Sequence, residues 1–205
     1  MGMKRVYITS VPLQGTGGLE KGVYQPCGFE LGVNVETSFP IITVLAQEEG
    51  NREDVKVIAL RTENGDAADN YAEFLRQLAG QGIREDQVAP VSVAEDQRPD
   101  AGIRSLFRIT GEIPEDSLVY ADLTFGTKPM SIMILYAAAF IEKLKDAEVQ
   151  GIYYGELPRR AGKADWERAR LYDLTVYKYL SDVIDQLNGL NVSDPESALR
   201  ELLDM

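Results

Sequence analysis

The chain has 205 residues with a formal net charge of −12, and 44% of its residues are hydrophobic and 26% charged. This length allows one domain with a sizeable core, and the composition is typical of a soluble globular protein. The acidic balance argues against general binding of duplex nucleic acid, which needs an extended cationic surface. A small anionic ligand in a local pocket is still compatible with it.

Histidine is absent and Cys27 is the only cysteine. These counts exclude a Ser-His-Asp triad, a histidine acid–base pair, an internal disulfide and a cysteine zinc site. We expect no metal site and no cofactor. The chain opens without a basic, apolar leader, and its densest apolar run, 130–141, is too short to span a membrane. A cytoplasmic location is therefore expected.

The first half of the chain alternates between strand and helix patterns. Strands are predicted at 4–11, 55–61 and 87–93, and helices at 39–49, 66–79 and 101–109. Ser38 is the expected N-cap of the first helix. The long segment 14–37 contains several glycines and a predicted hairpin of 22–24 against 30–35.

The second half continues the alternation, with strands at 117–125 and 149–154 and helices at 129–145 and 165–187. A break of the last helix near 173–175 is an alternative. The apolar face of 130–141 predicts a helix buried on most sides. The polar stretch 158–163 is interpreted as a linker. Within 191–205 we expect a short amphipathic helix capped at Ser193 or Asp194. A three-residue repeat, Asp-Leu-Thr at 122–124 and 173–175, is attributed to chance.

Strands that alternate with helices predict an α/β fold of the Rossmann-like type. We expect a mainly parallel sheet of five to six strands with helices on both faces. The expected organisation is one domain over 1–188 with a helical appendage at 189–205.

The junction between the strand at 117–125 and the helix at 129–145 carries a candidate phosphate site. Its turn contains Asp122, Thr124, Gly126, Thr127 and Lys128. The start of a helix presents unpaired N–H groups and partial positive charge, which favour a bound phosphate. The alternative is a well-capped turn in which Asp122 and Thr127 brace the backbone.

A second candidate loop follows the strand at 4–11. Its proposed ligand-binding residues are Thr9, Ser10, Gln14, Gly15, Thr16 and Gly17. In a parallel sheet both loops lie at the carboxyl edge, where ligands bind near the reversal of strand order. The glycines lack the spacing of a dinucleotide fingerprint, and Lys128 lacks the preceding glycine of a P-loop. A flexible turn is the alternative interpretation of these glycines.

Three motifs in order resemble those of the CRISPR-associated Rossmann-fold (CARF) domains. They are Asp122-Leu-Thr124-Phe-Gly126-Thr127-Lys128-Pro129, Tyr153-Tyr154-Gly155 and Tyr172-Asp173-Leu174-Thr175. The resemblance covers roughly residues 4–188. One departure is that Pro129 directly follows Lys128, where the family subset often has intervening residues.

The resemblance implies a symmetric homodimer that binds cyclic tetra- or hexa-adenylate across its two-fold axis in type III CRISPR antiviral defence. One interpretation is a sensor that acts on a separate effector protein. A second is a ring nuclease, in which Lys128, Ser10 and Thr124 would support metal-independent transesterification of the ligand. A third, from another class, is an unrelated Rossmann-like enzyme of nucleotides or sugar phosphates. The sequence leaves these alternatives open.

Overall fold

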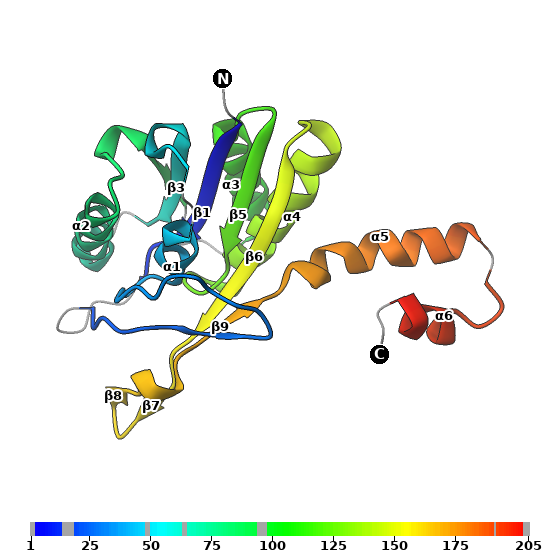
Figure 1. The fold of residues 1–205 in the computed structure, drawn as a ribbon. Coiled ribbons are helices and arrows are strands. Elements are labelled where there is room, and N and C mark those ends of the chain that lie inside the picture. Colours follow the sequence, from blue (N-terminus) through cyan, green and yellow to red (C-terminus); the bar gives the residue numbers. More distant parts are fainter. Residues whose placement is uncertain are drawn as a thin grey trace.

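A mainly parallel sheet runs through the middle of the protein, in the order β2-β9-β6-β5-β1-β3-β4 (Figure 1). The computed structural model describes residues 3–13, 19–47, 50–62, 65–93, 98–190 and 192–202. Five parallel strands form most of the sheet: β1 (Lys4–Ser10), β3 (Val55–Arg61), β4 (Val88–Ser92), β5 (Ser117–Asp122) and β6 (Glu148–Glu156). The predicted Rossmann-like α/β fold is confirmed.

Helices cover both faces of the sheet. On one face lie α1 (Pro40–Ala46) and α2 (Gly65–Gly80), and on the other α3 (Pro99–Glu112) and α4 (Lys128–Leu144). The strands supply both cores by alternation: Val6 and Ile8 pack toward α3 and α4, whereas Tyr7 between them packs toward α1 and α2. This period of two explains why the strand patterns were readable from the sequence.

Within the described residues the sheet has seven strands, more than the predicted five to six, because two short strands were missed. The first is β9 (Arg170–Asp173), which pairs antiparallel with β6 where a helix over 165–187, with a break near 173–175 as an alternative, was expected. Of the segment 165–187, a 3₁₀ turn at Trp166–Arg168 precedes β9, and the regular helix α5 (Thr175–Gly189) begins only after it. That prediction is wrong because a short apolar pattern suits either element, and pairing with β6 decides for a strand.

The second missed strand is β2 (Gln25–Cys27), which lies parallel to β9 at the edge of the sheet. The expected hairpin of 22–24 against 30–35 does not form, and Gly22 makes an isolated bridge to Thr37 instead. Proline is tolerated in an edge strand, which explains how Pro26 is accommodated in β2.

Two further expectations need correction. The supposed linker at 158–163 contains a hairpin, β7 (Arg159–Arg160) and β8 (Lys163–Ala164). Helix α1 has Phe39 as its N-cap without a side-chain bond, so Ser38 does not cap it.

The remaining helices agree with the sequence more closely. Helix α6 (Pro195–Leu202) begins after Asp194, whose Oδ1 accepts from the Ser197 N–H at 3.1 Å. Helix α5 leads away from the sheet, and α6 lies at its far end (Figure 1). The two remaining 3₁₀ turns are Arg52–Asp54 and Glu85–Gln87. Among the helices of the described segments, none has the length and apolarity needed to cross a bilayer.

Helix α4 is less buried than expected. Its inward side contributes Ile134, Ala137 and Ile141 to the core, but Ile132 and Tyr136 are 50% and 61% exposed. The apolar run therefore belongs to a helix that is buried on one side in the single chain and presents a second apolar side to its surroundings.

Candidate ligand-binding cleft

A cleft of about 620 Å³ opens over the carboxyl ends of β1, β5 and β6. The chain leaves β1 toward β3 and leaves β5 toward β6, so strand order reverses between these two neighbours. Ligands of open α/β sheets bind at such a reversal. The volume lies within the range of roughly 300–1,000 Å³ that is typical of small-molecule sites.

The floor of the cleft is a turn organised around Asp122. The Thr9 hydroxyl donates to its Oδ2 at 2.7 Å, and the Thr124 N–H donates to its Oδ1 at 2.9 Å. The Thr124 hydroxyl also donates to Oδ1 and accepts from the Gly155 N–H at 2.7 Å. The fully buried Asp122 carboxylate thus links β1 to the end of β5 by hydrogen bonds, and Thr124 links the same turn to β6.

Burial raises the pKa of Asp122 above its ordinary value, because the charged form loses its water. The hydrogen bonds from Thr124 and Thr9 act in the opposite direction, since they favour the carboxylate. The burial effect is the larger, so the proton is held more tightly in the folded protein than in the unfolded chain.

The loop after this turn passes very close to β1. Gly126 has φ of +95°, and a Cβ built on it would lie 3.0 Å from the Ser10 Oγ. Only glycine suits both the left-handed backbone and this approach. Ser10 is fully buried, and its hydroxyl has no hydrogen-bond partner among the residues described. Helix α4 starts directly afterwards, with Thr127 as N-cap and Lys128 as its first residue.

The predicted site residues fall into four groups. Thr124 and Gly126 line the cleft, whereas Thr9, Ser10 and Asp122 are fully buried. Thr9 and Asp122 are hydrogen-bonded to each other, which suits a bracing role, the alternative that the sequence had left open for Asp122. Lys128 is exposed and Thr127 half-buried at the start of α4, next to the lining residue Gly126. Gln14, Gly15, Thr16 and Gly17 lie outside the described residues.

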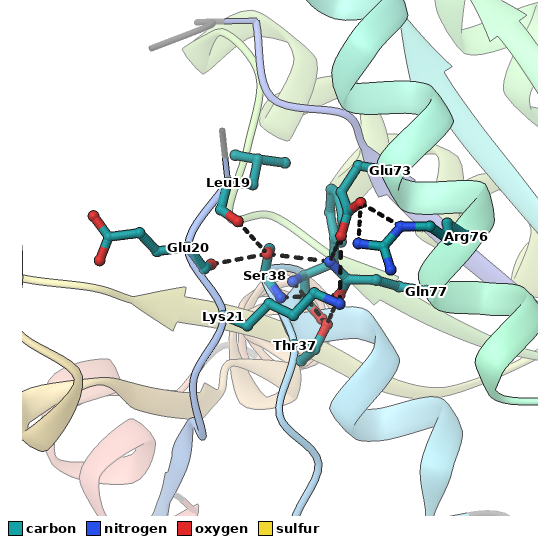
Figure 2. Close-up of polar contacts among 9 residues, drawn as sticks. Leu19, Glu20, Lys21, Thr37, Ser38, Glu73, Arg76 and Gln77 are labelled. Carbon is teal, nitrogen blue, oxygen red and sulfur yellow. Dashed lines mark hydrogen bonds and ion pairs between the residues drawn. The ribbon is translucent and has the colours of Figure 1, made fainter. Parts of the chain in front are cut away.

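One wall of the cleft depends on a polar cluster that the sequence did not reveal (Figure 2). Ser38 lines the cleft, and its hydroxyl donates to the Glu20 carbonyl at 2.8 Å. Gln77 of α2 holds the segment from behind: its Oε1 accepts from the Thr37 hydroxyl at 2.7 Å and the Ser38 N–H at 3.0 Å. Glu73 accepts from the Gln77 amide and pairs with two cations, Lys21 and Arg76. The contacts of Gln77 with Thr37 and Ser38, and of Glu73 with Lys21, join segments far apart in sequence, so no local pattern could have predicted them.

Three further lining residues were missed. Asn70 of α2 donates from Nδ2 to the Pro12 carbonyl at 2.9 Å and so fixes the chain where it leaves β1. Tyr154 and Arg159 come from β6 and from the β7–β8 hairpin. A basic Arg-Arg-Ala-Gly-Lys stretch at 159–163, shortly after the predicted strand at 149–154, was the available signal for this hairpin.

Neither a comparison with models of known protein families nor a search of curated proteins finds a match to this chain. Within the described ranges, His, Cys, Asp and Glu side chains form no group of three that could hold a metal ion. We therefore infer function from the cleft itself together with the sequence motifs.

Proposed function

We propose that the protein binds a cyclic oligoadenylate, cyclic tetra- or hexa-adenylate, and acts as a sensor or regulator in type III CRISPR antiviral defence. The observation that carries the proposal is the position of the cleft. It lies at the reversal of strand order, on a floor formed by the Asp122–Thr124–Gly155 turn, beside the start of α4. These segments carry two of the three motifs resembling the CARF family, those at 122–129 and 153–155.

The chemistry around the start of α4 supports a phosphodiester ligand. Gly126 leaves the backbone uncovered, and Lys128 places a cation at the positive end of a 17-residue helix. The buried hydroxyl of Ser10, which has no partner among the described residues, lies close behind Gly126. Phe125, half-buried in the cleft lining, provides an aromatic surface for an adenine. Tyr24, the other aromatic candidate, is only 1% exposed and packs edge-on against Trp166.

The outer surface of α3 and α4 supports a homodimer. Ile103 and Phe107 on α3 are 51% and 63% exposed, and Ile132 and Tyr136 on the neighbouring α4 are 50% and 61% exposed. A symmetric contact between two copies would remove these side chains from water and give a two-fold ligand two equivalent halves. Light scattering should show a dimer at micromolar concentration; a monomer with and without ligand would contradict this part of the proposal.

Binding and cleavage can be tested in one experiment. Purified protein is incubated with labelled cyclic tetra- or hexa-adenylate in excess EDTA, and bound ligand and products are measured together. Tight binding without product supports the sensor. Linear products with 2′,3′-cyclic phosphate ends would instead indicate a metal-independent ring nuclease, in which positioning of the ribose 2′-hydroxyl replaces a dedicated base. No binding of either ring at micromolar concentration would refute the proposal and favour another Rossmann-like phosphate-binding protein.

A further inference from the structure

The β7–β8 hairpin brings a cationic side chain to the cleft. It projects beyond the end of β6 (Figure 1), and three of its residues, Arg159, Gly162 and Ala164, line the cleft together with Thr124 and Gly126. In a chain with a net charge of −12, the segment 159–163 contains three cations and no acid. The hairpin is thus a positively charged segment of an acidic protein, and it lies at the candidate site.

Only one face of the hairpin belongs to the cleft. Arg159 is the register partner of Ala164, and both line the cleft; Arg160 is the register partner of Lys163, and neither does. This division follows from the alternation of side chains along a strand. Because the residue opposite Arg159 is an alanine, no bulky neighbour across the hairpin covers the guanidinium.

The hairpin is held in a defined geometry. Its two turn residues, Ala161 and Gly162, have φ of 51° and 83°, as a two-residue type I′ turn requires. The Asp165 N–H donates to the Pro158 carbonyl at 2.8 Å and closes the base of the hairpin. Arg159 therefore sits on a short, closed support.

The guanidinium of Arg159 is available for an external anion. In the part of the chain that the structure describes, no carboxylate forms an ion pair with it. Arginine presents a planar set of donors that matches two oxygens of a phosphate. The one acid in the described lining, Glu20, opposes anion binding, and Arg159 is the cation of that lining that can offset it.

We propose that Arg159 is a phosphate-binding residue of the cleft, so that its ligand carries at least two phosphate groups, one held at residues 126–128 and another at Arg159. This rests on the proposed function for the identity of the ligand as a cyclic oligoadenylate. The phosphate contact itself follows from the hairpin and applies to any ligand of the cleft that bears several phosphates.

The test compares Arg159→Gln with its matched control, Arg160→Gln. Both variants remove one charge from the same exposed hairpin, but only the first alters the cleft. Dissociation constants are measured by calorimetry for cyclic tetra-adenylate, cyclic hexa-adenylate, ATP and pyrophosphate, with glucose 6-phosphate as a single-phosphate comparison. For the multi-phosphate probe that binds the unmodified protein best, we expect Arg159→Gln to weaken binding about 10- to 150-fold. Arg160→Gln should stay within about twofold, and Arg159→Lys should be intermediate because it keeps the charge without the planar donor pair.

The outcomes separate this inference from the proposed function. Unchanged binding of a cyclic oligoadenylate by Arg159→Gln would overturn the role of Arg159 and leave the proposed function standing. Binding of ATP or pyrophosphate alone, weakened by Arg159→Gln, would support Arg159 and refute the cyclic ligand. Equal losses in the two variants, or no binding of any multi-phosphate probe at millimolar concentration, would overturn the inference. Matching thermal unfolding curves for both variants establish that the fold is intact.

Discussion

Asp122 and Asp173 are register partners of the same residue, Tyr153, on the two sides of strand β6. Each aspartate opens an Asp-Leu-Thr turn and accepts from the N–H of the threonine two residues on, at 2.9 Å for Thr124 and 2.8 Å for Thr175. Each threonine hydroxyl then accepts from an N–H of β6, that of Gly155 or Ile152. The two Asp-Leu-Thr segments make the same hydrogen bonds. The repeat therefore has a structural role, and its attribution to chance from the sequence is wrong.

This symmetry provides a matched pair of variants. Thr124→Val removes the hydroxyl beneath the cleft, and Thr175→Val removes its counterpart at the start of α5. Each leaves a β6 N–H without its acceptor, so we expect each to lower the free energy of unfolding by about 1–3 kcal/mol. Only Thr124→Val should also weaken binding of cyclic oligoadenylate, because Thr175 is not among the cleft-lining residues. Denaturant titrations and binding curves of the two variants test this difference; equal effects on binding would contradict it.

Lys128→Ala should weaken binding of cyclic tetra- and hexa-adenylate. Loss of a charge-assisted contact costs about 2–3 kcal/mol, which corresponds to about 30- to 150-fold in the dissociation constant. The control is Lys143→Ala at the other end of the same helix. Lys143 pairs with Asp182 at 2.7 Å and is not among the residues that line the cleft. If Lys128→Ala binds as the unmodified protein does, the phosphate site at the start of α4 is assigned wrongly.

The raised pKa of Asp122 predicts a specific pH dependence of stability. Because the folded protein holds this proton more tightly than the unfolded chain, the contribution of Asp122 is present at low pH. It is lost as the pH rises from the ordinary pKa of 3.8 through the raised value. The stability of the unmodified protein relative to Asp122→Asn should therefore fall over this window, with a slope of at most about 1.4 kcal/mol per pH unit.

Urea titrations of both proteins at a series of pH values measure this difference. The two proteins share all other titrating groups, so the comparison isolates position 122. A difference that stays constant would show that the hydrogen bonds from Thr9 and Thr124 balance burial, and one that grows in favour of the unmodified protein with rising pH would show that they outweigh it.

Gln77→Leu should destabilise the wall of the cleft. The change leaves the buried Thr37 hydroxyl and the Ser38 N–H without their shared acceptor, which costs about 2–4 kcal/mol. Arg76→Ala, one residue earlier on α2, removes a side chain that is 65% exposed and should change stability little. Chemical denaturation of the two variants provides the comparison, and similar losses would argue against the cluster shown in Figure 2 as a buried support.

The main strands and helices could be predicted to within a few residues because their hydrophobic periods are local and regular. Strand β1 alternates between the two cores at every residue from Val6 to Ile8, and that pattern is visible in the sequence. Where the pattern was short, the prediction failed. Residues 170–173 are compatible with either a helix or a strand, and only hydrogen bonding to β6 made them β9.

The sequence by itself determined the α/β fold, the strand–turn–helix at Asp122–Lys128 and the meeting of the ends of β1 and β5. These follow from local periodicity and from the rule that parallel strands share a carboxyl edge. The tertiary structure decided which side chains face the cleft. It buried Thr9, Ser10 and Asp122, and it brought Ser38 and Arg159 to the surface of the site. The physical reason is that burial and hydrogen-bond partners depend on contacts between segments far apart in the chain, as in the bond from Thr9 to Asp122 across 113 residues.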